Sequence, residues 1–226
     1  AGRFRYARDA QLYVAAHGIL LSILARYANL PPLAIAYEYS AHGKPILAQL
    51  DGGGTIDFNM GHSGDLVLIA IGGQRAVGVD VERVQEDVDL QELSYACLTG
   101  HEAEILRTVP DECRREQLFR WWTRKEAYAK ACGAGLAISP KECQVTPPFL
   151  TVTTPDEFVA PARPSKNWAL WDVSPLAGYV GAVAARGERK AIRFIDYAPG
   201  DPGHTPPSGV DPWGADERER RFRSRG

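Results

Sequence analysis

Apolar residues recur at helical spacing early in the chain and then give way to shorter runs. Over residues 9–26 the apolar positions repeat every three or four residues, which predicts a helix that ends before Pro31-Pro32. The runs that follow are separated by turns at 42–45 and 52–54 that contain glycine. We therefore predict strands at 34–39, 56–60, 66–71 and 76–81.

The second half of the chain repeats this order. Thr99 is placed to cap one helix, and Gly133 and Gly135 are placed to end another, so helices are predicted at 90–97, 101–107 and 114–132. Strands are predicted after them at 143–145, 149–153, 168–173, 179–185 and 192–197. The repeated order predicts an α+β chain of two similar lobes, residues 1–86 and 87–198.

Composition argues against a membrane protein and against a general nucleic-acid-binding protein. Residues 199–226 are rich in Pro, Gly and Asp and end in an Arg/Glu run, which predicts a disordered or extended tail. The 226-residue chain is 45% hydrophobic but has no apolar run of the length, about 20 residues, that a membrane span needs. A net charge of −2 gives no general attraction to nucleic acid. The four cysteines form no CxxC pair, which indicates free thiols in a reducing cytoplasm.

Two carboxylates lie close together in the segment Gly78-Val79-Asp80-Val81-Glu82. Side chains alternate along a strand, so Asp80 and Glu82 share one face and repel each other. Mg²⁺ would relieve this repulsion, because it binds one or two carboxylates together with substrate phosphates. The alternative is an ordinary strand with a solvated acidic face.

A second pattern lies in the longest predicted helix. Trp122, Glu126 and Lys130 are four residues apart and therefore share one stripe of the helix. The carboxylate could bind a metal and the ammonium could neutralise a phosphate. The alternative is a Glu–Lys pair beside a core tryptophan.

Two segments that resemble turns supply a third set of candidate ligand-binding residues. The segment 58–64 contains His62 and Ser63 between two predicted strands, and Gly43-Lys44-Pro45 places a lysine on another turn. An ordinary hairpin turn with a surface histidine would explain the segment 58–64 equally well. Taken together, the acidic residues and the cations of Lys44, His62, Lys125 and Lys130 predict a metal and phosphate site between the lobes.

These motifs, in this order and approximate separation, resemble the 4′-phosphopantetheinyl transferases of the larger, pseudo-dimeric Sfp type. The resemblance spans about residues 9–136. It implies two related lobes, each with helices packed on a small, mostly antiparallel sheet, and a cleft that binds coenzyme A and Mg²⁺, with Mn²⁺ as an alternative. The implied reaction transfers phosphopantetheine from coenzyme A to a serine of an apo acyl or peptidyl carrier protein and releases 3′,5′-ADP.

The resemblance also implies a role for each candidate residue. It assigns the metal to Asp80, Glu82 and Glu126, and it places Glu126 to take the serine proton. It assigns the adenosine and 3′-phosphate end of coenzyme A to Lys44, Pro45, His62 and Ser63, and the pyrophosphate to Lys125 and Lys130, with Lys130 stabilising the leaving phosphate. The implied enzyme is a cytoplasmic monomer of polyketide or nonribosomal peptide biosynthesis.

The sequence departs from the family pattern at three positions. Gly61 stands where the family usually has a serine, and Leu12 and Leu21 stand where relatives often have arginines. These departures leave open a protein that binds coenzyme A or a nucleotide without turnover. A metal-dependent phosphohydrolase is a further alternative, although the acidic cluster lacks the extra Asp and His ligands of a two-metal site.

Overall fold

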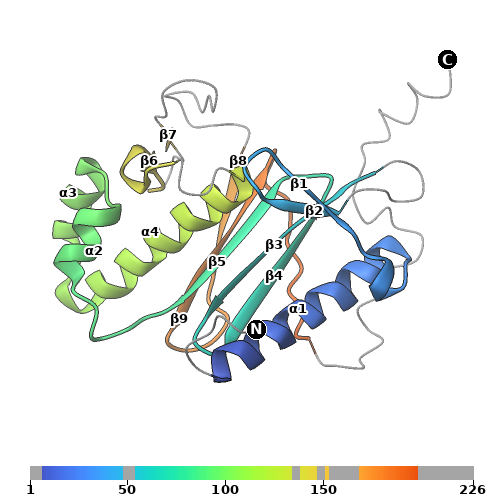
Figure 1. Ribbon diagram of the computed structural model, residues 1–226. Helices are drawn as coiled ribbons and strands as arrows, with labels where there is room; N and C mark the ends of the chain where they lie inside the picture. The colour runs from blue at the N-terminus through green and yellow to red at the C-terminus, as the bar shows by residue number, and fades with distance from the viewer. Residues whose placement is uncertain (1–6, 48–53, 134–137, 147–150, 153–167, 198–226) are drawn as a thin grey trace, which may run out of the picture.

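The first half of the chain forms one antiparallel sheet and a long helix (Figure 1). The computed structural model describes residues 7–47, 54–133, 138–146, 151–152 and 168–197. The helix α1 (Ala7–Ala28) and the short 3₁₀ helix η1 (Pro32–Ala34) come first. The sheet then has the order β1-β2-β3-β4, with strands Tyr37–Tyr39, Pro45–Leu47, Ile56–Ser63 and Leu66–Gly73.

The second half forms another antiparallel sheet, in the order β5-β9-β8. Its strands are β5 (Val77–Arg83), β8 (Trp168–Val173) and β9 (Tyr179–Arg186). The helices are α2 (Leu90–Cys97), α3 (Gly100–Thr108) and α4 (Asp111–Cys132). The small elements η3 (Pro140–Glu142), β6 (Cys143–Gln144) and β7 (Thr151–Val152) complete the described part. The boundary between the two sheets thus falls between β4 and β5, ahead of the predicted lobe boundary at residue 86.

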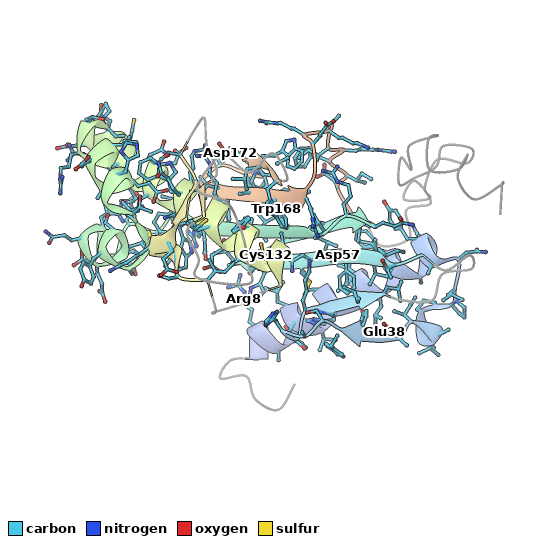
Figure 2. All side chains as sticks on the ribbon, turned by 90° about the horizontal axis from the view of Figure 1, so that it is seen from above. Arg8, Glu38, Asp57, Cys132, Trp168 and Asp172 are labelled. Carbon is cyan, nitrogen blue, oxygen red and sulfur yellow. The ribbon has the colours of Figure 1, made fainter. Side chains whose placement is uncertain are left out.

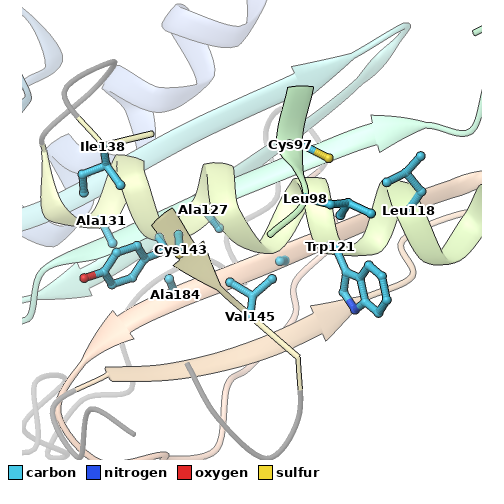
Figure 3. Packing of buried hydrophobic residues seen from close by; sticks show 12 residues of the cluster. Cys97, Leu98, Leu118, Trp121, Ala127, Ala131, Ile138, Cys143, Val145 and Ala184 are labelled. Carbon is cyan, nitrogen blue, oxygen red and sulfur yellow. The ribbon is translucent and has the colours of Figure 1, made fainter. Parts of the chain in front are cut away.

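Each of the two larger sheets is covered by a helix of 22 residues. The apolar stripe of α1, including Leu20 and Leu24, packs against Ile56 and Phe58 of β3. The helix α4 packs on β5 and β9, and the core beneath it contains Leu118, Trp121, Ala127, Ala131 and Ala184 (Figure 3). This close packing requires Gly78 on β5, because a Cβ atom there would lie 2.1 Å from the carbonyl oxygen of Ala127. The predicted α+β class with antiparallel sheets is confirmed.

The two sheets are joined by side chains that reach from β3 to β5. The Asp57 Oδ1 atom accepts a hydrogen bond from the Val77 amide at 3.0 Å, and Asn59 Oδ1 accepts one from the Val79 amide at 2.9 Å. Ser63 Oγ accepts a third from the Arg83 amide at 3.0 Å. The partners are 20 residues apart in all three cases, so β3 and β5 lie side by side and run in the same direction. We call these three contacts the β3–β5 rungs.

Several element predictions are wrong in detail. The strand predicted at 56–60 is confirmed but extends to Ser63 as β3, so residues 61–63 are not part of a turn: His62 pairs with Val67 across the hairpin, and the chain reverses at Gly64-Asp65. The predicted turn at 42–45 runs into β2 at Pro45, where Pro45 pairs with Tyr39. Residues 192–197 form no strand. The predicted strand at 34–39 is reduced to β1 behind η1.

Other local predictions are confirmed. Thr99 caps α3 in a reciprocal capping box with Glu102, and Gly133 ends α4 in the left-handed conformation with φ 69°. All four cysteines are free. Gly135, most of the predicted strand at 149–153 and the predicted tail at 199–226 lie outside the described residues. Among the helices in the described part of the chain, none is long and apolar enough to cross a membrane.

Candidate active site

The strand β5 presents its acidic side chains to α4. Gly78, Asp80 and Glu82 alternate with buried valines, and Gly78 packs directly on α4. The Lys130 Nζ atom, near the end of α4, donates to Asp80 Oδ1 at 2.7 Å and to the Val79 carbonyl at 3.4 Å. The other oxygen of Asp80, Oδ2, is buried and has no hydrogen-bond partner among the described residues. One buried carboxylate oxygen therefore remains available to a ligand.

The pKa shifts place three carboxylates in one electrostatic neighbourhood. Burial raises the pKa of Asp80 to about 6, Lys130 opposes this rise, and the charges of Glu82 and Glu126 add to it. Burial also raises the pKa of Glu126, again opposed by Lys130 and reinforced by Glu82. Asp80 and Glu126 therefore interact with the same ammonium group, and the charge of Glu82 acts on both of them, as expected for residues that surround one site.

The three carboxylates do not form a preassembled metal centre. Within the residues that the structure describes, no group of three His, Cys, Asp or Glu side chains is arranged to hold one metal ion. Asp80 is paired with Lys130, and Glu82 Oε2 accepts a hydrogen bond from Ser63 Oγ at 2.7 Å. The donor set nevertheless suits Mg²⁺ chemically, because its members are carboxylate oxygens and Asp80 Oδ2 accepts no hydrogen bond from any described residue. The ligand assignment stays a prediction.

Ser63 supports Glu82 in this structure. Its hydroxyl donates to Glu82 and accepts from the Arg83 amide, so both contacts are made to β5. The residue is 9% exposed. Its predicted contact with the phosphate of coenzyme A is therefore not favoured, whereas its neighbour His62 is exposed on the other face of β3.

Lys44 is a buried structural lysine, contrary to its predicted role in phosphate binding. Its side chain is 8% exposed, and Nζ donates to Asp57 Oδ1 at 2.6 Å, to the Val77 carbonyl at 2.8 Å and to the Ala131 carbonyl at 3.3 Å. An ammonium group has three donors, and all three are used here. Figure 2 shows Asp57 near the end of α4 that Cys132 marks. Lys44 therefore joins β3, β5 and α4.

Lys125 is also buried rather than directed at a pyrophosphate. Its side chain is 1% exposed, and Nζ donates to Glu102 Oε2 at 2.5 Å, to the Cys97 carbonyl at 2.7 Å and to the Pro140 carbonyl at 2.8 Å. The other oxygen of Glu102 accepts from the Val145 amide at 2.8 Å. One residue step turns an α-helix by about 100°, so Lys125 points away from the side of α4 that carries its neighbour Glu126.

The sequence interpretation missed the polar partners that hold these side chains. Asp57 was not singled out, and Asn59 was part of a candidate segment but received no role of its own, although both alternate with apolar Ile56 and Phe58 along β3. This alternation indicates a strand with one polar face, and it was available in the sequence. Glu102 was not recognised as a buried residue, because a capping-box glutamate is normally exposed to solvent.

The sequence matches two family models. Residues 76–184 match the 4′-phosphopantetheinyl transferase superfamily, and residues 1–73 match the model described as 4′-phosphopantetheinyl transferase, N-terminal. The two matches meet between β4 and β5, where the structure passes from one sheet to the other.

Individual relatives agree with these models. The 4′-phosphopantetheinyl transferase HetI of Nostoc sp. is 36% identical over 198 residues, which is 87% of this chain and 80% of that protein. The L-aminoadipate-semialdehyde dehydrogenase-phosphopantetheinyl transferase of Rattus norvegicus is 27% identical, over 82% of this chain and 64% of that protein. The 4′-phosphopantetheinyl transferase psf-1 of Bacillus pumilus is 30% identical, over 61% of this chain and 56% of that protein.

Among solved structures, the holo-[acyl-carrier-protein] synthase of Thermotoga maritima is 23% identical with a TM-score of 0.40, over 51% of this chain and 64% of that one. The ACPS–CoA complex of Chronobacterium ammoniagenes is 19% identical with a TM-score of 0.38, over 51% of this chain and 98% of that one. Both TM-scores lie below 0.5, so the assignment depends on the sequence relatives and the family models. On that basis, this chain belongs to the 4′-phosphopantetheinyl transferase superfamily.

Proposed function

We propose that the protein transfers the 4′-phosphopantetheine arm of coenzyme A to a serine hydroxyl of an apo carrier protein and releases 3′,5′-ADP. Membership of the superfamily supports the reaction type. The observation on which the proposal depends most is the surroundings of Asp80. Lys130 neutralises one carboxylate oxygen, and the other is buried and has no hydrogen-bond partner in the part of the chain that the structure describes. Such a pair beside two further carboxylates suits a ligand that contains both a cation and phosphates.

The proposed metal ligands are Asp80, Glu82 and Glu126, with Mg²⁺ as the ion. When bound, the ion would offset the negative charge of the pyrophosphate. Ser63 keeps the Glu82 carboxylate in place on β5 through its 2.7 Å hydrogen bond. Without such a bond, a charged side chain beside two like charges would turn away from them.

Two side chains are proposed to act on the reacting groups. The Lys130 side chain is 31% exposed, so its ammonium can contact both Asp80 and a phosphate of the substrate, where it would stabilise the charge of the leaving group. Glu126 has a raised pKa because of burial, which makes its carboxylate a stronger base for the serine proton. Reaction then requires that the serine oxygen lie in line with the β-phosphorus and the leaving oxygen.

Part of the predicted coenzyme A contact set is not retained in the proposal. Lys44 and Lys125 use their three donors inside the protein. His62 and Lys130 remain as proposed contacts to the phosphates. The carrier class, the cytoplasmic location and the monomeric state stay predictions.

Intact-mass spectrometry tests the proposal directly. The protein is incubated with coenzyme A, Mg²⁺ and a panel of apo acyl and peptidyl carriers. We expect a gain of about 340 Da on at least one carrier, the mass of one phosphopantetheine arm, and no gain when its target serine is changed to alanine. Asp80→Asn should abolish the gain while the protein stays folded by circular dichroism.

Two further measurements, made beside the mass analysis, distinguish the competing functions. Coenzyme A binding by calorimetry without a mass gain on any carrier would identify a binding protein without turnover. Release of inorganic phosphate from coenzyme A or simple esters would identify a phosphohydrolase. Either result would contradict the proposed transfer.

A further inference from the structure

Three oxygen atoms from separate elements converge on the ammonium group of Lys44. They are Oδ1 of Asp57 on β3 at 2.6 Å, the carbonyl oxygen of Val77 on β5 at 2.8 Å and that of Ala131 on α4 at 3.3 Å. All three surround one nitrogen atom, so they lie close to one another. Because each carries negative charge, they would repel one another without a cation between them. We call this arrangement the Lys44 anchor.

The Lys44 anchor caps α4 from outside the helix. The last four carbonyls of a helix have no partner within it, and Ala131 supplies one of these carbonyls. A positive charge is also favourable there, because the helix dipole makes this end of a helix negative. The aliphatic part of Lys44 lies against the C-cap, since a Cβ atom at Gly133 would be 3.3 Å from Lys44 Cβ. Lys44 thus contacts the last turn of α4, which contains Lys130.

The Lys44 anchor also lies beside an ion pair of the candidate active site. Ala131 follows Lys130 on α4, and Val77 is on β5 three residues before Asp80. The 2.7 Å contact between Lys130 Nζ and Asp80 Oδ1 therefore joins the same helix turn to the same strand. Without the ammonium, the converging oxygens would push that turn and that strand apart. We propose that Lys44 is a positioning residue, which keeps the last turn of α4 against β5 so that Lys130 reaches Asp80.

Lys44 acts through Lys130 and not on the substrate. Its side chain is 8% exposed and its three donors are all used, so none is left for a phosphate. The effect of Lys44 on the reaction rests on the proposed function. The anchor itself is a property of the protein without substrate and can be tested there.

The packing of α4 on β5 offers a competing explanation. Ala127 lies against Gly78, about one helix turn before the Lys44 anchor. If this contact is enough to hold the end of the helix, removing the Lys44 ammonium lowers the stability of the protein but leaves the ion pair of Lys130 intact. The two explanations therefore differ in what happens to Lys130.

A double variant removes the ammonium without leaving a buried charge. Lys44→Met alone would leave the carboxylate of Asp57 buried without its cation, which is strongly destabilising. Lys44→Met combined with Asp57→Asn avoids this, and the new amide oxygen can still accept a hydrogen bond from the Val77 amide. Asp57→Asn alone is the matched control, because it keeps the nitrogen of Lys44 between the two carbonyls. Circular dichroism checks that both variants are folded.

Competitive acetylation of lysines tests the Lys44 anchor without substrate. Mass spectrometry gives the acetylation rate of Lys130 relative to that of the exposed Lys141. We expect this ratio to rise about 3- to 10-fold in the double variant and to stay unchanged in the matched control, because an amine outside an ion pair reacts more often. The buried Lys125 on the same helix should stay protected. An unchanged ratio at Lys130, or a rise that Lys125 shares through general loosening, would overturn the proposal.

Kinetic constants test the effect of the Lys44 anchor on the proposed reaction. In the double variant kcat should fall about 10- to 100-fold with little change in the KM for coenzyme A, because a misplaced Lys130 loses contacts made in the transition state. Lys190→Met removes an exposed ammonium group and should leave both constants unchanged. A kcat within about twofold of that of the unaltered protein would overturn the proposal, and a raised KM beside it would identify Lys44 as a coenzyme A contact. Faster acetylation of Lys130 in a protein that modifies no carrier would contradict the proposed function and leave the anchor in place.

Discussion

Three lysines with the same charge have different surroundings in this protein. The side chains of Lys44 and Lys125 are 8% and 1% exposed, whereas that of Lys130 is 31% exposed. The two buried ammonium groups donate to three acceptors each. Lys130 alone of these three combines an ion pair with access to solvent, so the chemical role of each lysine is set by its neighbours.

Lys125→Met should destabilise the protein, because it leaves Glu102 charged and unpaired in the core. Breaking a buried ion pair in this way typically costs about 3–5 kcal/mol. Urea denaturation would measure the change in the free energy of unfolding. Lys125→Met combined with Glu102→Gln should recover part of that loss, since no isolated charge remains. Lys130→Met should lower transfer activity with a smaller loss of stability. Equal losses of stability in the two single methionine variants would contradict these assignments.

Ser63→Ala should weaken the response to Mg²⁺, because it frees the Glu82 carboxylate from its hydroxyl partner. Removing a group that orients a metal ligand typically lowers metal affinity about 10- to 100-fold. The measurement is transfer activity titrated with Mg²⁺. The control is Ser22→Ala, whose hydroxyl bonds to the Gly18 carbonyl within α1. An unchanged half-saturating Mg²⁺ concentration in Ser63→Ala would show that the Ser63 contact does not support a metal ligand.

The sequence predicted part of this site at the residue scale. Alternation along β5 correctly put Asp80 and Glu82 on one face, and the i, i+4 spacing placed Glu126 and Lys130 on one stripe of α4. The burial of Lys44 and Lys125 could not be predicted, because their partners Asp57 and Glu102 are 13 and 23 residues away in the chain. Local spacing contains no information on such tertiary pairs.

At the scale of elements, β3 shows why boundaries are harder to predict than the elements themselves. The polar and glycine residues of 59–64 resemble a turn in the sequence. In the structure, Asn59 and Ser63 are polar because they accept hydrogen bonds from β5, and Gly61 is small because β5 lies close to it. The residues that resemble a turn are thus explained by a neighbouring strand, which no local pattern could reveal.

The link between α4 and β8 gives a prediction about pH. Arg124 forms a bidentate pair with Asp172, with N–O distances of 2.7 and 2.6 Å. Burial would raise the pKa of Asp172, but the hydrogen bonds and charge of Arg124, with Arg120 and Arg189, lower it below 3.8. The contribution of this carboxylate to stability is therefore present above its unfolded pKa and is lost as the pH falls through the folded value.

Urea denaturation of Asp172→Asn between pH 7 and pH 3 checks whether the stabilisation by Asp172 is lost as the pH falls. The variant should be less stable than the unaltered protein at pH 7, and the difference should shrink as the pH falls below about 4. Asp65→Asn is a suitable control, because Asp65 pairs with Arg8 at an exposed site where an ion pair contributes little. A stability difference for Asp172→Asn that stays constant down to pH 3 would contradict the lowered pKa.

At the scale of the whole molecule, the join between the two sheets is largely polar on the side where β3 faces β5. One apolar cluster lies under α1 and another under α4, and a third, which contains Val77 and Trp171, includes Ala70 of β4. The rungs instead connect side-chain oxygens of β3 with backbone amides of β5. Asp80 and Glu82 lie on β5 between these amides. The rungs therefore also fix the position of their carboxylates along the strand direction relative to β3.

Asn59→Ala should therefore loosen β5 while leaving the apolar clusters under α1 and α4 intact. The Val79 amide would lose its partner, and a buried amide without a partner costs about 1–3 kcal/mol. Amide hydrogen exchange should become faster at Val79 and its neighbours on β5 than in the unaltered protein, with little change in β4. The exposed Gln91→Ala on α2 serves as the control. If Val79 keeps its protection in Asn59→Ala, the rung does not hold β5, and the two sheets must be joined mainly by α4 and by the packing of side chains around it.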